Sequence, residues 1–316
     1  MRVSVFTEPH RGASYDDQLR FARLVEAGGF EGFFRADHYQ SMGDDAGLPG
    51  PTDAWLTLAA LARETSRIRL GTLVSSATFR LPGPLAVMVA QVDQMSGGRV
   101  ELGIGAGWYE REHTSYGIPF PPVGERFDRL AEQLEILTGL WATPSGETYS
   151  FKGDHYRLVD APALPKPVQR PGPPVIVGGR GPKRTPELAA RYADEFNMPF
   201  KTVAETATAY ERVIEACDRV GRTGSGRAPL VLSAGVVVAI GRTDAEAQRR
   251  AAPLHVKSAL PPEDPVVGSP AQLVDRLGEF AAIGATRVHL RLIDFADLDH
   301  LELIAAEVLP QLDGTR

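Results

Sequence analysis

The sequence is poor in cysteine and contains no long apolar run. Only one of its 316 residues is a cysteine, Cys217. A single cysteine excludes an internal disulfide and a structural zinc site built on cysteines. Because Cys217 falls within a helical pattern, we interpret it as a packing residue and not as a nucleophile. No stretch of about eighteen or more apolar residues occurs, so the sequence predicts no membrane-spanning helix.

The sequence also lacks an excess of positive charge. Its 34 lysines and arginines stand against 40 aspartates and glutamates, which gives a formal net charge of −6. We therefore expect neither nucleic acid nor an anionic membrane as a partner. The first ten residues, MRVSVFTEPH, read as a strand and lack the basic and long apolar regions of a secretory signal, which predicts a cytoplasmic location.

Several catalytic signatures are missing as well. The chain has no HExxH, no GxSxG and no CxxC, which are typical of zinc proteases, serine hydrolases and dithiol sites, respectively. We expect no metal site. A P-loop lysine pattern is also absent, which argues against hydrolysis of nucleoside triphosphates.

Short strand-like runs alternate with amphipathic helical patterns along nearly the whole chain. The predicted strands span residues 2–6, 32–36, 68–74, 100–104, 175–177, 195–198, 230–240 and 287–292. The predicted helices span residues 15–27, 54–65, 84–95, 124–141, 185–193, 203–220, 245–260, 270–283 and 298–308. This α/β alternation favours a single domain, 1–316, folded as a (β/α)8 TIM barrel, with an open doubly wound sheet as the alternative.

One segment, residues 143–174, breaks the alternation after strand four. It contains seven prolines, and residues 149–151 and 155–157 flank a turn at Lys152-Gly153-Asp154. This pattern predicts a hairpin within an extended insertion. We expect the insertion to lie over the mouth of the site.

Asp37 and His38 directly follow the second predicted strand. Active sites of such barrels lie at the carboxyl ends of the strands, and an acid can orient a neighbouring imidazole toward a reacting atom. Asp37 and His38 are therefore candidate catalytic residues. The alternative is that Asp37 caps a helix and His38 packs locally. The run after the third strand, residues 72–76, carries no strong chemical signal of its own.

The fourth predicted strand runs into a glycine-rich stretch, Leu102 to Tyr109. Its glycines would let the backbone approach a flat ligand, and Trp108 and Tyr109 could wall a pocket. A dinucleotide-binding GxGxxG would need glycine at position 108, and polar residues follow where an apolar helix should open. We therefore reject that interpretation.

Gly178, Gly179 and Arg180 follow the fifth predicted strand, ahead of a helix. Free backbone N–H groups at a helix start, with glycines and the nearby cations Lys183 and Arg184, are suited to hold a phosphate. The alternative is a flexible turn with solvated basic side chains.

Taken together, these stretches resemble the luciferase-like monooxygenase superfamily, and within it the deazaflavin-dependent oxidoreductases. The resemblance runs from Arg2 to about Pro310 and is specific only as a set. The motifs that carry it lie at residues 29–33, 36–38, 67–72, 79–80, 96–108, 124–127, 174–179, 189–194 and 267–270.

The resemblance implies a barrel with an insertion, commonly a homodimer, with the cofactor at the mouth. It implies that Asp37 contacts the cofactor ring, that His38 sits at the reactive face, and that a non-proline cis peptide at Leu73-Val74 backs the ring. It also implies a phosphate loop at Gly178-Gly179. The expected cofactor-binding residues are thus Asp37, Thr72, Leu73, Val74, Gly107, Trp108, Gly178, Gly179, Arg180 and Arg184.

The resemblance implies hydride transfer between coenzyme F420 and a small organic substrate. FMN also fits, as in a monooxygenase; the cations at positions 180, 183 and 184 favour the longer anionic tail of F420. The sugar-phosphate branch of the family has an acidic glutamate where Trp108 stands, so its substrate pocket does not carry over. Phe79, Trp108 and Tyr109 indicate a substrate with some hydrophobic surface.

Two hypotheses of other classes remain open. A non-catalytic barrel could bind a flavin without using Asp37 or His38 in any reduction. A hydrolase would need paired carboxylates at strand ends, for which Glu8 and Asp294 are candidates, although either could be a helix cap.

Overall fold

The computed structural model describes residues 1–43, 47–255, 263–292 and 294–312, and its centre is a closed ring of eight parallel strands. In order around the ring these are β1 (Arg2–Thr7), β2 (Gly32–Arg35), β3 (Arg69–Ser76), β4 (Val100–Gly105), β7 (Val175–Gly178), β8 (Glu195–Pro199), β9 (Val231–Ile240) and β11 (Arg287–Arg291). Strand β11 pairs with β1, and β8 pairs with β9, so no edge is left open. The predicted (β/α)8 TIM barrel is confirmed.

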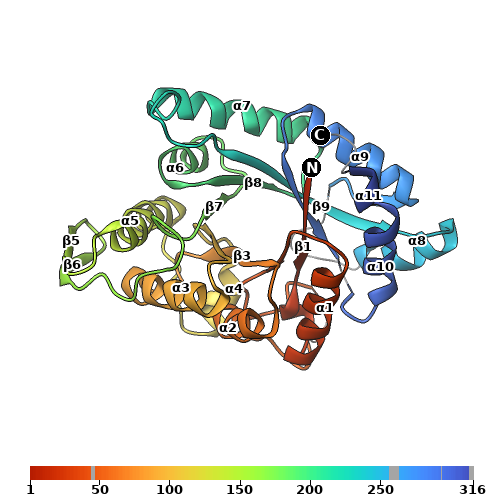
Figure 1. Ribbon diagram of the computed structural model, residues 1–316, viewed down its shortest axis with the longest axis horizontal. Coiled ribbons are helices and arrows are strands. Elements are labelled where there is room, and N and C mark those ends of the chain that lie inside the picture. The colour runs from red at the N-terminus through yellow and green to blue at the C-terminus, as the bar shows by residue number, and fades with distance from the viewer. Residues whose placement is uncertain (44–46, 256–262, 293, 313–316) are drawn as a thin grey trace.

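Helices surround the ring (Figure 1). They are α1 (Tyr15–Ala27), α2 (Ala54–Glu64), α3 (Pro82–Ser96), α5 (Val123–Ala142), α6 (Arg184–Tyr192), α7 (Val203–Arg219), α8 (Asp244–Ala251), α9 (Pro270–Ala282) and α10 (Leu298–Glu307). The sequence did not predict α4 (Glu110–Ser115), α11 (Leu309–Leu312), β10 (Val266–Gly268) or the 3-10 turn Pro9–Arg11. The predicted helix 245–260 ends earlier, at Ala251, and a 3-10 turn, Ala252–His255, follows; residues 256–260 lie outside the described part of the chain.

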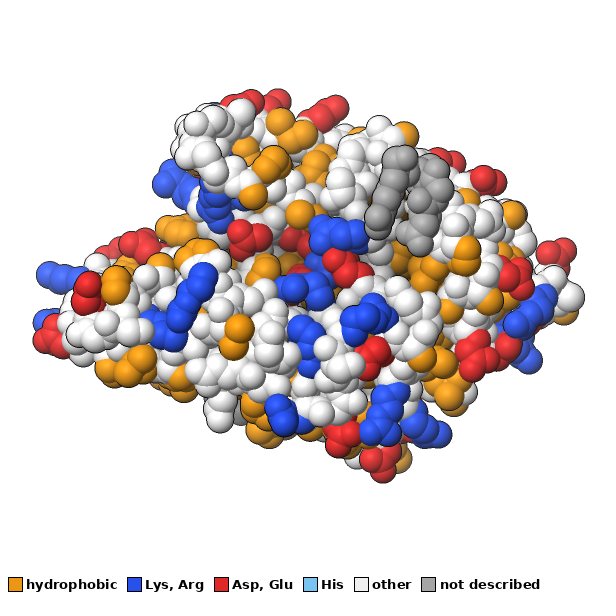
Figure 2. Space-filling model, in the orientation of Figure 1, with side chains coloured by type: hydrophobic (Ala, Val, Ile, Leu, Met, Phe, Trp, Pro, Cys, Tyr) orange, Lys and Arg blue, Asp and Glu red, His pale blue; other side chains and the backbone are white. Residues whose placement is uncertain are grey.

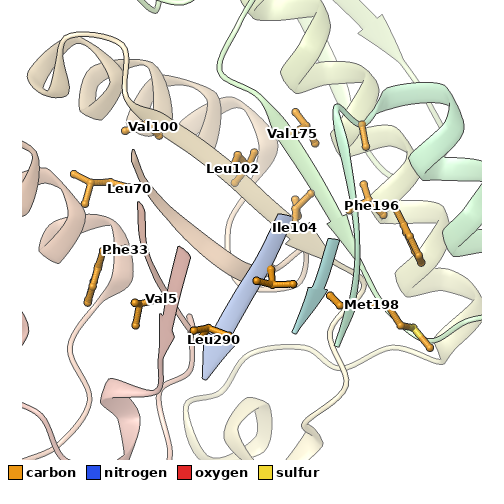
Figure 3. Close-up of a cluster of buried hydrophobic side chains, with 14 of the residues drawn as sticks. Val5, Phe33, Leu70, Val100, Leu102, Ile104, Val175, Phe196, Met198 and Leu290 are labelled. Atoms are coloured by element: carbon orange, nitrogen blue, oxygen red, sulfur yellow. The ribbon is translucent and has the colours of Figure 1, made fainter. Parts of the chain in front are cut away.

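Strand alternation divides the side chains into an outer and an inner set. Apolar side chains face the helices and form the main core, and Figure 3 shows Val5, Phe33, Leu70, Val100 and Val175 from five neighbouring strands in this layer. Each is at most 1% exposed. Burying a side chain of this size contributes about 1.5–3 kcal/mol, so this layer holds the barrel together.

The amino-terminal end of the barrel interior is filled by charged side chains. Arg287 donates from Nη1 to Glu101 (2.6 Å) and Glu195 (2.8 Å), and all three side chains are at most 4% exposed. Ser233 Oγ donates to Glu195 at 2.6 Å, and His289 Nε2 lies 2.9 Å from the same carboxylate. Burial would raise the pKa of Glu195, but Arg287 and His289 hold it well below its usual range. This paired network closes that end of the barrel.

The insertion lies on the outside of the helical layer and not over the mouth. Its hairpin, β5 (Tyr149–Lys152) and β6 (Arg157–Ala161), lies outermost beyond α5 (Figure 1). Backbone N–H groups at 154–156 donate to the Glu132 carboxylate on α5. Further along, Gln169 donates to the carbonyl of Val100, the first residue of β4. The segment therefore runs toward the amino-terminal end, and the prediction that it covers the mouth is wrong.

Two predicted absences can be compared with the described residues. Within them, no helix has both the length and the apolar character needed to cross a bilayer. They also contain no cluster of three or more His, Cys, Asp or Glu side chains placed to hold a metal ion. Cys217 is buried on α7, and burial raises the pKa of its thiol, as a packing role requires.

Candidate functional site

A cavity of about 450 Å³ lies at the carboxyl ends of the barrel strands. Its wall includes the end of β3 (Leu73 to Ser76), the loop after β4 (Gly105 to Trp108) and the loop after β7 (Gly178 to Gly181). Figure 2 shows one face of the molecule, on which cationic and anionic side chains alternate around a hollow near the centre. Because positive and negative side chains are mixed there, that face has no large electrostatic field of one sign. The volume of the cavity suits a small ligand.

His38 lies on the cavity wall, as its position after β2 predicts. Its Nδ1 is 2.8 Å from Oε1 of Glu112, a residue of the short helix α4 that is 1% exposed. The His38 ring also meets the rings of His10 and Trp108 edge-on, with centroids 5.2 and 6.1 Å apart. The imidazole is therefore held from three sides. Glu112 and His10 were missed at the sequence level, because their approach to His38 depends on loops that fold over the mouth.

Asp37 lies behind the cavity wall and not on it. Its carboxylate accepts from Arg80 at 2.5 and 3.2 Å and from Ser75 Oγ at 2.6 Å, and the residue is 1% exposed. Arg80 also pairs with Asp53, the N-cap of α2, at 2.6 Å. Asp37 thus has no place on the cavity wall, and its contact with the cofactor stays a prediction. Ser75, which does line the cavity, stands between that carboxylate and a ligand.

Strand β3 contains the expected irregularity. Its register with β4 shifts between Thr72 and Ser75, and the Leu73-Val74 peptide bond is cis, as the resemblance implies. Leu73 and Val74 line the cavity. Thr72 does not, because it faces the helical layer and donates from Oγ1 to the carbonyl of Gly103 at 2.8 Å. Its role in cofactor binding stays a prediction that the lining of the cavity does not support.

The glycines of β4 and β7 make room for Val74. A Cβ on Gly103, Gly105 or Gly178 would lie 3.1 Å from a Val74 methyl group, which is tight enough to displace it. Gly107 has a φ of +81°, and a Cβ there would overlap Ser76 Oγ. Gly103 is thus a spacer within the protein, Gly105 both makes room for Val74 and lines the cavity, and Gly107 and the 44% exposed Trp108 also lie at the cavity.

The loop before α6 contributes a possible anion site. Gly178, Gly179, Arg180 and Gly181 line the cavity together with Thr185 in the first turn of the helix. The start of a helix carries unpaired N–H groups and the positive end of its dipole, which favour an anionic ligand. Gly179 has a φ of +153°, a conformation that side-chain-bearing residues rarely adopt.

The two predicted arginines of this loop point in different directions. Arg180 lines the cavity, donates to the carbonyl of Pro199 at 3.1 Å and lies 3.8 Å from Glu263. Arg184 points away from the cavity: it donates to Asp128 at 2.5 Å and does not line the wall, so its cofactor contact stays a prediction that this geometry does not support. Lys183 is exposed and does not line the cavity either.

Two buried arginines on the wall were missed. Arg126, in the first turn of α5, and Arg291, at the end of β11, are 9% and 4% exposed. In both, the buried Nε has no hydrogen-bond partner within the described chain. Burial lowers the pKa of Arg126. Residues 124–127 belong to the motif set, and Arg291 lies within the last predicted strand, but only the closed barrel brings Arg126 and Arg291 to one cavity.

The carboxylates considered for hydrolysis are not brought together. Glu8 lines the cavity and pairs with Arg291 at 2.5 Å, whereas Asp294 is exposed and caps the backbone of Ala296 at 2.8 Å. The hydrolase hypothesis therefore lacks its second acid.

Two of the three predicted aromatic wall residues are also elsewhere. Phe79 packs against Tyr39 and His113, each with centroids 5.0 Å apart, and the Tyr109 hydroxyl donates to the carbonyl of Ser41. Only Trp108 of the three lines the cavity. The other aromatic wall residues are Phe6, Phe127 and Phe200.

Known proteins share this architecture, and some are similar to the chain in sequence. The chain is 35% identical over 213 residues to an F420-dependent glucose-6-phosphate dehydrogenase of Microbacterium testaceum, a match that covers 66% of this chain and 60% of that relative. Monooxygenase RslO1 from Streptomyces bottropensis matches 99% of this chain and 100% of its own, with a TM-score of 0.82 at 21% identity. An F420-dependent secondary alcohol dehydrogenase, solved with an F420-acetone adduct, matches 98% of both chains with a TM-score of 0.81 at 20% identity.

The two solved structures establish a shared fold at these low identities. The sequence match to the dehydrogenase spans less than two thirds of that protein's length. The family model described as luciferase-like monooxygenase matches residues 1–263, which is most of the chain and contains the strands from β1 to β9. The chain therefore belongs to the luciferase-like monooxygenase family.

Proposed function

We propose that the protein is an oxidoreductase that transfers a hydride between coenzyme F420 and a small organic substrate. The observation that carries the proposal is one cavity that combines the Leu73-Val74 bulge, the His38 imidazole and a helix-start anion site. The sequence similarity to an F420-dependent dehydrogenase supports the same cofactor.

The residues present fit a flat ring that carries an anionic tail. Leu73 and Val74 offer an apolar surface on which one face of a ring can rest. The unpartnered Nε groups of Arg126 and Arg291 are buried donors on the same wall, and buried donors normally have an acceptor. The N–H of Gly179 donates to the carbonyl of Asn197, and the backbone N–H groups that follow it, up to Thr185, add a second set of donors suited to a phosphate. When bound, the cofactor would supply the carbon that gives or takes the hydride.

His38 is the residue we assign to proton transfer. Its ring lines the cavity, and Nε2 has no hydrogen-bond partner among the residues that the structure describes. A group placed in this way can take a proton from a substrate hydroxyl or return it, which contributes typically about 10²–10⁴-fold to the rate. Trp108 at the rim limits access of water to the same space. Asp37 would act indirectly, by fixing Ser75 and Arg80 behind the wall.

Coenzyme F420 is favoured over FMN by the cations on the wall. Arg126 and Arg180 lie on the same wall as the glycine loop, where a tail longer than one phosphate could reach them. FMN remains the second candidate, because the same loop could hold a single phosphate, and the protein would then act as a monooxygenase. The third hypothesis is a barrel that only binds a flavin. It predicts that substitution of His38 has no effect on any reduction.

Absorbance and fluorescence titrations of the purified protein with F420 and with FMN test the assignment. We expect saturable binding of F420 with FMN at least about tenfold weaker. Tighter binding of FMN would move the assignment to the monooxygenase, and binding of neither would remove it. Turnover is then assayed by F420 reduction against a panel of alcohols.

The substrate is proposed to be an organic molecule with hydrophobic surface and not a sugar phosphate. Trp108 occupies the position of the acid used in the sugar-phosphate branch, and Phe6, Phe127 and Phe200 make much of the wall apolar. Assay with glucose 6-phosphate checks this directly. The homodimer implied by the resemblance is tested by light scattering, and the cytoplasmic location predicted from the sequence is tested by fractionation.

A further inference from the structure

We infer that Glu112 is a positioning residue that fixes the tautomer of His38, with the proton on Nδ1 and an unprotonated Nε2 offered to the cavity. The tautomer follows from the protein's own contacts. Only its catalytic consequence rests on the proposed function.

Glu112 uses both carboxylate oxygens on the loop that carries His38. Oε2 accepts the backbone N–H of Tyr39 at 3.0 Å, and Oε1 lies 2.8 Å from His38 Nδ1. A carboxylate has no proton to give, so the hydrogen between Oε1 and Nδ1 belongs to the imidazole. A histidine with one ring nitrogen fixed as donor presents the other as acceptor in its neutral form.

The short helix that bears Glu112 is anchored from below. The next residue, His113, is fully buried, with Nε2 2.5 Å from Thr78 Oγ1 and Nδ1 2.7 Å from the carbonyl of Tyr109. Thr78 in turn contacts Ser76 Oγ at 2.5 Å, at the end of β3. This chain of contacts ties α4 to the barrel, so the carboxylate of Glu112 has a fixed place.

The other side of the His38 ring faces groups that leave Nε2 unpaired. His10 and Trp108 approach edge-on and restrict rotation of the ring, and neither forms a hydrogen bond with it in the described structure. His10 is itself 2% exposed. Burial, together with the nearby arginine charges, lowers the pKa of His10 well below its usual range, so His10 stays neutral beside His38.

The catalytic consequence is a balanced proton and hydride transfer. A bound cofactor would take the hydride from the carbon of a substrate alcohol, and His38 Nε2 would take the hydroxyl proton, so that the C–O bond becomes a carbonyl. The imidazolium that forms is stabilised by the Glu112 carboxylate through Nδ1–H. Reduction of a carbonyl runs the same steps backward.

Glu112→Gln tests the inference with almost no change in shape. The backbone N–H of Tyr39 can only donate, so the glutamine must turn its carbonyl oxygen to it and its NH2 group to His38. Nδ1 then becomes an acceptor and the proton moves to Nε2, which is the wrong tautomer for accepting a proton. The same logic underlies the loss of activity when the aspartate of a serine-protease triad is changed to asparagine.

The measurement is the pair of ring 15N chemical shifts of His38, assigned with His38→Gln, in protein without cofactor and at a pH where the shifts no longer change. We expect a protonated Nδ1 and a bare Nε2 in the wild type and the reverse in Glu112→Gln. Glu110→Gln, an exposed residue on the same helix, is the matched control and should leave the shifts unchanged.

Turnover gives the second readout. We expect Glu112→Gln to lower turnover by about 10²–10⁴ while the Kd for F420 stays within about twofold. A wild-type His38 with its proton on Nε2 overturns the inference, whether or not any variant folds. Failure of F420 to bind, with the expected tautomer present, overturns the proposed function and leaves the role of Glu112 standing.

Discussion

The two ends of the barrel interior treat buried polar groups in opposite ways. At the amino-terminal end, Arg287 is paired with both Glu101 and Glu195 at hydrogen-bond distance. At the carboxyl end, Arg126 and Arg291 keep a buried Nε without a partner within the described chain. A buried polar group left unpaired costs about 1–3 kcal/mol, and a ligand in the cavity would supply the acceptor for these two arginines; His289 Nδ1 at the closed end is also unpaired within the described chain, but it does not line the cavity. One end of the barrel is built for stability and the other for binding.

The same contrast appears along a single strand. The inward positions of β4 are Glu101, Gly103 and Gly105 in turn, so one strand supplies a charge to the closed end and empty space to the open end. Val74 enters that space from the neighbouring strand. The absence of side chains at Gly103 and Gly105 thus allows Val74 to form the floor of the cavity.

The largest expected effect is a loss of turnover, caused by a substitution at the open end of the barrel. His38→Ala should lower turnover by about 10²–10⁴ and leave the Kd for F420 within about twofold, because in the proposed function the imidazole transfers a proton and does not hold the cofactor. Steady-state kinetics and a binding titration measure the two quantities. His155→Ala, on the hairpin outside the cavity, serves as the control, and unchanged turnover in His38→Ala would remove this residue from the mechanism.

The next largest effect is a loss of stability, caused by a substitution at the closed end of the barrel. Arg287→Met removes the cation that Glu101 and Glu195 share, which leaves Glu195 buried without an arginine while Arg69 still pairs with Glu101, so we expect a loss of about 3–5 kcal/mol in the free energy of unfolding. Denaturant unfolding measures it. Arg20→Met, in an exposed pair with Asp17, should cost no more than about 0.5 kcal/mol. Equal losses in both variants would contradict the special role of the network.

Acid separates the two ends by the pH at which each loses stability. The pKa of His10 is lowered, first by burial, so the unfolded chain binds the proton more readily and stability falls as pH drops below about 6.5. The pKa of Glu195 is lowered because Arg287 outweighs burial, so its contribution is present above about 4.3 and is lost below that value. Each group adds at most about 1.4 kcal/mol per pH unit to the slope.

Unfolding free energies measured across that range, in the wild type and two variants, check these windows. His10→Phe should flatten the part of the curve just below pH 6.5, and Glu195→Gln should flatten the part below about pH 4.3. A variant that flattened the other window would show that the groups had been assigned to the wrong end.

The smallest effect sharpens the boundary of the site. Arg184→Ala should leave the Kd for F420 within about twofold, because its guanidinium is engaged by Asp128 away from the cavity. Arg126→Ala should weaken binding about 10–100-fold, as expected for a lost charge-assisted contact. Isothermal titration of both variants compares them. A larger loss in Arg184→Ala would restore the contact predicted from the sequence.

Sequence patterns located the site but not the direction of its side chains. His38, the Leu73-Val74 bulge and the Gly178-Gly179 turn are on the cavity wall, where their places after strands predict them. Asp37, Thr72 and Arg184 are each next in sequence to a wall residue and do not themselves line the cavity. Side chains on a strand alternate between its two faces, and a one-residue shift reverses the outcome.

The sequence by itself determined the alternation of strands and helices, and with it the barrel and the end at which chemistry occurs. That information is local, because hydrophobic period and glycine or proline placement act over a few residues. Tertiary structure alone decided that Glu112, 74 positions beyond His38, would meet its ring, and that Arg126 and Arg291 would share one cavity. Such contacts depend on how distant loops close over the barrel, and a pattern that extends over a few residues cannot predict them.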